Sequence, residues 1–144
     1  MTARYDADTI FATILLGDIP CHKVIEDENA IVLMDVMPES VGHTLIVPMA
    51  ESRNLLDADP SVLATVAPLL RRVAVAAKQA FGADGISVMQ FNEAAGGQTV
   101  YHLHFHVIPR YEGVPLQAHG RGMEDHGVLA ANAEKLRAAL GATE

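Results

Sequence analysis

The N-terminal half of the chain alternates short apolar runs with polar breaks. Asp8 is placed to cap a helix, and Gly17 stands where glycine favours a helix end. Two apolar runs, joined by a hairpin-like turn at Glu28-Asn29, and a third after the loop MPESVGH have strand character. The pattern therefore predicts a short helix over 9–16 and strands over 21–27, 29–35 and 44–48.

The C-terminal half begins with a long stretch of helical periodicity. From Pro60 to Phe81 the apolar positions form one broad face, and Pro68 should kink or interrupt that helix. Two further strands over 85–92 and 101–109 and an amphipathic helix over 128–140, followed by Gly141, complete the pattern. The order predicts one α+β domain over residues 1–144, with a mainly antiparallel five-stranded sheet.

The last predicted strand carries the most unusual segment, YHLHFHVIPR. Side chains alternate across a strand, so His102, His104 and His106 should share one face, and the Leu, Phe and Val between them should enter the core. A half-buried strand needs some polar residues facing solvent, but Lys, Thr or Glu would serve equally well. Three histidines at strict spacing therefore indicate a chemical role.

Two kinds of chemistry use alternating histidines. Neighbours on one face lie roughly 6.6 Å apart, so His102 with His104, or His104 with His106, is able to share a metal ion with further ligands. Alternatively, a neutral imidazole attacks phosphorus and forms a labile phospho-imidazole, while a neighbouring histidine protonates the leaving group. The strand alone leaves both open.

The loop upstream of the histidines, NEAAGGQT, favours a phosphate ligand. Gly96 and Gly97 allow close approach of the backbone and offer N–H groups, although a plain hairpin turn explains glycines equally well. Gln98 and Thr99 add neutral donors, and Asn92 ends the preceding strand. Together these residues predict an anion-binding cradle beside the histidine face.

Composition narrows the function classes. The 144-residue chain has a formal net charge of −8 and no run of Lys or Arg, so nucleic-acid binding is not expected. One cysteine, Cys21, excludes a disulfide framework and a multi-cysteine metal site. The apolar stretch 62–81 contains Arg71 and Arg72 and is expected to be a core helix rather than a membrane span. Without a signal-like N-terminus, a cytoplasmic protein is expected.

The segment HLHFHVI matches every position of the H-φ-H-φ-H-φ-φ motif, where φ is apolar, and so resembles the histidine triad (HIT) family. The longer run NEAAGGQTVYHLHFHVIPR is similar to that family's phosphate loop and strand, and residues 10–48 resemble its opening helix, hairpin and third strand. The resemblance covers about residues 9–110 and leaves a tail, 111–144. It implies binding of a purine nucleotide, hydrolysis or transfer at the α-phosphorus, and a homodimer with a ten-stranded sheet.

The resemblance also implies a role for each site residue. His104 would be the nucleophile, His106 would contact the α-phosphate and the leaving group, His102 would support the strand, and His43 would buttress the nucleophile. The other implied contacts are to phosphate by Asn92, Gly97, Gln98 and Thr99, to ribose by Asp35, and to the base by Phe11, Ile14, Leu33 and Val36. The four apolar residues are equally compatible with plain core.

Departures from the family pattern affect metal and substrate. Many bacterial members have C-x-x-C where this chain has Thr9 and Ala12, and a histidine where it has Glu51, so no zinc and no other cofactor is predicted. A histidine at position 106 favours a hydrolase over a transferase. The ending HVIPR leaves nucleoside phosphoramidates and dinucleoside polyphosphates both open as substrates.

Two alternative functions are left open by the sequence: a metal-dependent hydrolase, and a non-enzymatic module that binds a nucleotide or a protein partner.

Beyond Arg110 the resemblance to the family fades. His119, Arg121 and His126 are predicted to be solvated loop residues.

Overall fold

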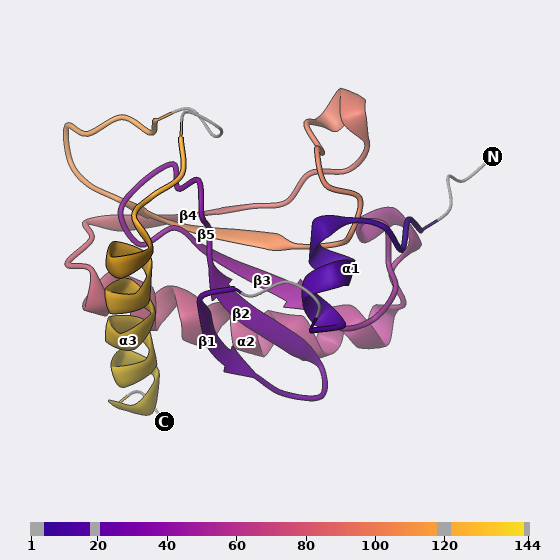
Figure 1. Cartoon of the computed structure of the whole chain (residues 1–144), viewed down its shortest axis with the longest axis horizontal. Helices are drawn as coiled ribbons and strands as arrows, with labels where there is room; N and C mark the ends of the chain where they lie inside the picture. The colour runs from indigo at the N-terminus through magenta and orange to yellow at the C-terminus, as the bar shows by residue number, and fades with distance from the viewer. Residues whose placement is uncertain (1–4, 18–20, 118–121, 143–144) are drawn as a thin grey trace.

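The computed structural model describes residues 5–17, 21–117 and 122–142 of the chain. Its helices and strands follow in the order α1 (Ile10–Leu15), β1 (Lys23–Glu26), β2 (Ala30–Met34), β3 (Thr44–Pro48), α2 (Pro60–Ala80), β4 (Gly85–Met89), β5 (Phe105–Arg110) and α3 (His126–Ala142) (Figure 1). Two short 3₁₀ turns, η1 (Leu55–Asp57) and η2 (Ala94–Gly96), lie in the connections.

The five strands form one antiparallel sheet in the order β1-β2-β3-β5-β4. The long helix α2 runs along one face of the sheet, α1 lies over the other face, and α3 stands beside β1 (Figure 1). The predicted α+β fold, with an antiparallel five-stranded sheet, a long helix and a C-terminal helix, is confirmed.

Both faces of the central strands are covered, which explains why these strands are apolar throughout. In β2 and β3, Val32 and Ile46 pack in the core formed with α2 and α3. Their neighbours Leu33 and Leu45 point to the opposite face and pack with Phe11 of α1. Because strand side chains alternate, a sheet covered on both sides requires consecutive apolar residues.

Helix α2 begins with Pro60 after Asp59, whose carboxylate accepts the N–H of Ser61 at 2.8 Å. It continues through Pro68 as one helix, so a break between two segments is wrong, whereas a kink at Pro68 stays a prediction. By length and composition alone α2 could cross a membrane. Its apolar stripe, however, packs on the sheet, as the sequence predicted for a core helix.

Several element ends differ from their predicted positions. Thr9, rather than Asp8, caps α1, and its hydroxyl accepts the N–H of Ala12 at 3.1 Å. Gly17 has the left-handed φ of +82° expected after a helix. At the other end of the chain, α3 starts at His126 and extends past Gly141.

The last strand begins four residues later than predicted, at Phe105, so only His106 of the three histidines lies in the sheet ladder. Upstream of it, Leu103 donates its N–H to the carbonyl of Ser52 at 2.8 Å instead of continuing the pairing with β3. The fourth strand is also shorter than predicted and ends at Met89. The histidine segment is therefore an irregular approach followed by a strand.

Candidate active site

A cavity of about 660 Å³ opens on the α1 side of the sheet. It is bordered by α1, the end of β2, the loop before β5, and the start of α3. The site residues expected from the sequence that line it are Phe11, Ile14, Leu33, Asp35, Val36, Gly97, Gln98, Thr99, His104 and His106. The chain thus brings together residues from both halves of the sequence around one hollow.

His104 has a defined tautomer. Its Nδ1 lies 2.6 Å from the carbonyl oxygen of His102, and because a carbonyl only accepts, Nδ1 must carry the hydrogen. The lone pair of the neutral ring is therefore on Nε2. The edge of the ring packs against Phe11, with 4.7 Å between ring centroids. Nε2 of His104 can therefore act as a nucleophile or as a metal ligand at the cavity.

His106 has the opposite arrangement. The backbone N–H of Glu39 donates to Nδ1 of His43 at 3.0 Å, so the hydrogen of His43 lies on Nε2. That N–H is 2.9 Å from Nδ1 of His106, which accepts it, and a neutral His106 then carries its own hydrogen on Nε2. His43 was expected to support the nucleophile; the hydrogen bond seen here supports His106. The two cavity histidines therefore offer one lone pair and one donor, with ring centroids 5.0 Å apart.

Asp35 lies directly after β2 and is almost fully buried at the cavity. One carboxylate oxygen accepts the N–H of Met37 at 2.9 Å, and the other is 3.4 Å from Nε2 of His43. Potential ligand atoms of Asp35, His43 and His106 lie within 4.8 Å of one another. Two histidines and a carboxylate are a common metal donor set, so this trio replaces the histidine pairs expected from the sequence as the candidate metal site.

His102 is fully buried and both ring nitrogens are engaged. Nε2 donates to the carbonyl of Pro48 at 2.7 Å, and Nδ1 lies 2.6 Å from the hydroxyl of Tyr5, which donates to it. Burial is the main cause that lowers the pKa of His102. The ring is thus a neutral support that fixes the carbonyl on which His104 depends.

The free energy of unfolding should fall as the pH drops below about 6.5. There the unfolded chain protonates His102 while the folded chain does not, so the unfolded state binds more protons. Urea unfolding at pH 7.5 and 5.5 should show a weaker pH dependence for His102→Gln, by up to about 1.4 kcal/mol per pH unit. An unchanged pH dependence would contradict the assignment of a buried neutral ring.

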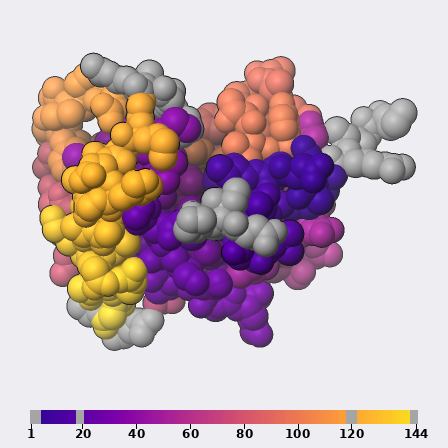
Figure 2. Space-filling view, viewed as in Figure 1, coloured from indigo at the N-terminus to yellow at the C-terminus, as the bar shows by residue number. Residues whose placement is uncertain are grey.

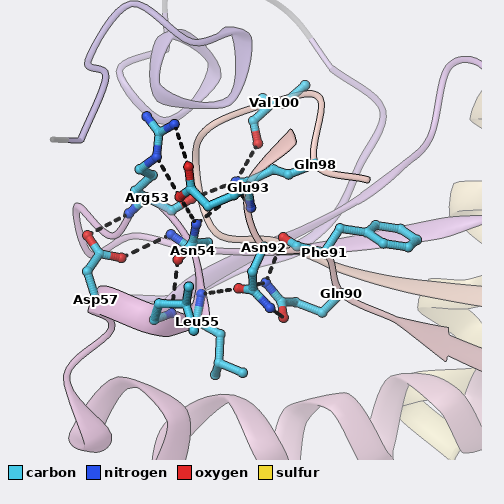
Figure 3. A network of polar contacts seen from close by, with 11 residues as sticks. Arg53, Asn54, Leu55, Asp57, Gln90, Phe91, Asn92, Glu93, Gln98 and Val100 are labelled. Carbon is cyan, nitrogen blue, oxygen red and sulfur yellow. Dashed lines mark hydrogen bonds and ion pairs between the residues drawn. The ribbon is translucent and has the colours of Figure 1, made fainter. Parts of the chain in front are cut away.

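Gln98 is nearly fully buried, and its side-chain amide is committed to the loop itself (Figure 3). Its Oε1 accepts from Nδ2 of Asn54 at 3.0 Å and from the N–H of Glu93 at 2.7 Å. Its amide nitrogen donates to the carbonyls of Arg53 and Val100 at 2.8 and 3.0 Å. The phosphate contact expected of this side chain is therefore not what the structure shows, because every hydrogen is already donated within the loop.

An ion pair that the sequence analysis missed holds the same loop. Arg53 binds Glu93 through two parallel hydrogen bonds of 2.9 and 3.0 Å, and Asn54 donates to the same carboxylate at 2.6 Å (Figure 3). The hydrogen bond from Arg53 lowers the pKa of Glu93. Glu93 also has a φ of +65°, a conformation that side chains rarely adopt. The only sequence signal was the Asn54–Asp57 spacing, which forms a capping box.

Asn92 also differs from its expected role. Its Oδ1 accepts the N–H of Leu55 at 2.9 Å, and its amide pairs reciprocally with that of Gln90 (Figure 3). It is not among the residues that line the cavity. Asn92 therefore joins the loop to η1 and does not face the histidines.

The two loop glycines supply fewer donors than expected. The N–H groups of Gly96 and Gly97 donate to the carbonyls of Glu93 and Ala94, each at 3.0 Å. Gly97 has a φ of +99° and lines the cavity. The Thr99 hydroxyl makes no hydrogen bond within residues 5–17, 21–117 and 122–142, so it is a donor ready for a ligand.

The C-terminal segment also borders the cavity, through Met123 and His126. His126 is the first residue of α3, so its predicted place in a loop is wrong, but it is exposed to solvent as predicted, and it lies 2.9 Å from His22. Periodicity alone could not show this contact between residues 104 positions apart. His119 and Arg121 lie outside the described residues.

The residues at the expected zinc positions do not fit a thiolate site. The Thr9 hydroxyl caps α1 by accepting the N–H of Ala12, and alanine has no ligand atom. The absence of zinc remains a prediction.

The sequence matches a family model and proteins of known name. The family model for the HIT domain matches residues 17–113. Adenylylsulfatase HINT3 of Arabidopsis thaliana is 36% identical over 105 residues, which are 73% of this chain and 53% of that protein. This chain therefore matches only about half the length of that relative. Adenosine 5′-monophosphoramidase hnt1 of Schizosaccharomyces pombe is 32% identical over 114 residues, 79% of this chain and 80% of that protein.

Solved structures agree along nearly the whole chain. A Hit-like protein from Bartonella henselae has 50% identity and a TM-score of 0.91, covering 95% of this chain and 99% of its own. A zinc-bound histidine triad family protein from Mycobacterium smegmatis has 34% identity and a TM-score of 0.83, covering 94% and 95%. With the family model matching most of the sequence, the chain belongs to the histidine triad (HIT) domain family.

Proposed function

We propose that this protein is a hydrolase that cleaves nucleoside phosphoramidates at the α-phosphorus through a nucleotidyl-His104 intermediate. The observation that carries the proposal is the 2.6 Å hydrogen bond from Nδ1 of His104 to the carbonyl of His102. It leaves a lone pair on Nε2 beside the cavity. The names of two relatives, an adenylylsulfatase and an adenosine 5′-monophosphoramidase, support an adenylyl conjugate as substrate.

In the first step, Nε2 of His104 attacks the α-phosphorus. The P–N bond breaks, its electron pair returns to nitrogen, and the amine leaves after taking one proton from solvent. The modified ring carries a positive charge, which the carbonyl of His102 stabilises through the Nδ1 hydrogen. Water then attacks phosphorus, releases one proton, and frees His104 and the nucleoside monophosphate. The Nε2 hydrogen of His106 stabilises the phosphoryl oxygens in both steps.

The rest of the cavity suits a nucleoside. The Asp35 carboxylate is able to accept hydrogen bonds from ribose hydroxyls, and Phe11, Ile14, Leu33 and Val36 provide apolar surface for a base. Phe11, Ile14 and Leu33 also complete the core on the α1 side of the sheet, and Val36 packs against the core on the α2 side, so the base would be held by a rigid surface.

A trapping experiment tests the covalent step. The protein is mixed in excess with an adenosine phosphoramidate labelled in the adenine ring, and the reaction is stopped in alkaline detergent, in which a phosphorus–imidazole bond survives. Label on the protein, located at His104 by peptide mass analysis, is the expected result. Turnover with no label at early times would reject the intermediate, and a nucleotide that binds with neither label nor turnover would favour a binding module.

Asp35, His43 and His106 are the candidate ligands for the alternative function, a metal-dependent hydrolase. If Asp35, His43 and His106 hold a catalytic metal, turnover should be lost in a chelator and restored by a divalent ion. The mechanism proposed above instead predicts full turnover after the chelator is added.

Dinucleoside polyphosphates gain no support from the structure. The ending HVIPR, which left this substrate class open, includes Arg110. The guanidinium of Arg110 donates to the hydroxyl of Ser87 at 3.2 Å, and Arg110 does not line the cavity. A phosphoramidate is therefore the substrate class we propose.

We also propose that the protein is a homodimer joined along β4. This strand is an edge of the sheet, and Val88 on it and Val75 on α2 are about half exposed, at 48% and 46%. An apolar edge is a ready surface for strand pairing. Sedimentation equilibrium should give twice the mass of one chain.

A further inference from the structure

Two histidines that the proposed chemistry does not use border the same cavity. His22 lies just before β1, and His126 begins α3. Nε2 of His22 is 2.9 Å from Nδ1 of His126, and the two rings lie 5.1 Å apart at an angle of 33°. The C-terminal segment lies against the N-terminal part of the chain on one face of the molecule (Figure 2). The two rings are therefore joined where they border the cavity, although their contact is exposed to solvent.

The pair belongs to the end of the cavity that the proposed function gives to the nucleoside. The carbonyl of His22 accepts the N–H of Met34 at 3.0 Å, and the N–H of Glu124 donates to the carbonyl of Val36 at 2.9 Å. Both imidazole-bearing segments are thus fastened to residues 34–36, the stretch that includes Asp35. His106 reaches the same stretch from β5, since potential ligand atoms of Asp35 and His106 lie within 4.8 Å of each other.

The hydrogen bond between the rings determines what the pair offers to a ligand. Two neutral imidazoles have two N–H groups and two lone pairs, and their mutual bond uses one of each. One donor and one acceptor remain, and neither ring makes another hydrogen bond within the described part of the chain. When both rings change tautomer, the hydrogen bond between them reverses and the two roles are exchanged.

Purine bases present the complementary pattern. Adenine has an amino donor beside ring-nitrogen acceptors, and guanine has a ring N–H donor beside its carbonyl oxygen. Apolar surfaces around a base do not distinguish such groups strongly, whereas a site built to hydrogen-bond them does. We propose that the His22–His126 pair contacts the edge of the base and is the specificity-determining element for the nucleoside. This inference rests on the proposed function only in taking a nucleotide as the occupant.

Binding measurements test the inference without requiring turnover. Isothermal titration at pH 8 would compare AMP, GMP and purine riboside 5′-monophosphate, which lacks the exocyclic group. The wild-type protein should bind AMP and GMP roughly three- to tenfold more tightly than the purine riboside compound, the effect of one hydrogen bond. His126→Leu should bind all three alike.

A second variant separates base contact from a purely structural clasp between β1 and α3. His126→Gln keeps one donor and one acceptor and should restore much of the preference for AMP and GMP over the purine riboside compound. If the pair were only a clasp, His126→Leu would weaken all three ligands equally and leave their ratio unchanged. That outcome, or equal affinities in the wild-type protein, would overturn the inference.

The outcomes also separate this inference from the proposed hydrolase. A base preference that disappears in His126→Leu supports the pair even if no label is trapped on His104. Conversely, trapped label together with equal affinities overturns the role of the pair and leaves the hydrolase standing.

Discussion

Replacing His104 by alanine should abolish turnover of an adenosine phosphoramidate while AMP still binds. In the proposed mechanism the imidazole supplies the electron pair that attacks phosphorus, and the carbonyl of His102 holds its hydrogen on Nδ1. Removing a nucleophile typically lowers kcat by about 10⁴-fold or more. AMP affinity should change by only a few-fold, because Asp35 and the apolar wall remain.

Steady-state rates and titration calorimetry on the same preparation measure both quantities. As a control, His104→Gly leaves a space into which free imidazole can diffuse, and added imidazole should restore part of the rate. A His104→Ala protein with more than a few per cent of wild-type kcat would be incompatible with covalent catalysis at this residue.

Periodicity was sufficient for the framework that positions His104. Short apolar runs located the central strands, and their continuous apolar character follows from a sheet packed on both faces. It also placed the cavity histidines opposite Val107, which lies in the core with α2. These features depend on residue types and short spacings, which a sequence displays directly.

Periodicity failed where side chains bond to the backbone. His102 and His104 fit a strand pattern, yet His102 donates to the carbonyl of Pro48 and His104 donates to the carbonyl of His102. Such bonds compete with the sheet ladder and delay the strand to Phe105. An alternating pattern looks the same whether or not the ladder continues.

The loop amides show a second limit. An amide side chain serves equally well to bind a phosphate or to close a loop, and the partner decides which. For Gln98 the partners include Asn54 and the carbonyl of Arg53, more than 40 positions earlier in the chain. The sequence shows that amides stand in this loop but not the direction in which they point.

The second large expected effect is a loss of kcat when the tautomer of His106 is no longer fixed. His43 accepts a hydrogen bond from the N–H of Glu39 and therefore presents its own N–H to His106. Without that donor, His106 is free to place its hydrogen on Nδ1 and turn a lone pair toward the phosphoryl oxygens, which repel it. We expect His43→Leu to lower kcat by about 10²-fold, the lower range for a misplaced acid–base or donor group.

Glutamine at position 43 is the matched control, because its amide has an acceptor and a donor at a spacing close to that of the two ring nitrogens. Its oxygen can accept from Glu39 and its nitrogen can donate to His106, so His43→Gln should keep most of the wild-type kcat. Nitrogen NMR of labelled histidine should show His106 with its hydrogen on Nε2 in the wild-type and Gln proteins, and on either nitrogen in His43→Leu. Thermal unfolding of all three proteins separates this effect from loss of the fold. Equal kcat in the Leu and Gln variants would mean that the buried ring of His43 only fills space, and that the orientation of His106 is set elsewhere.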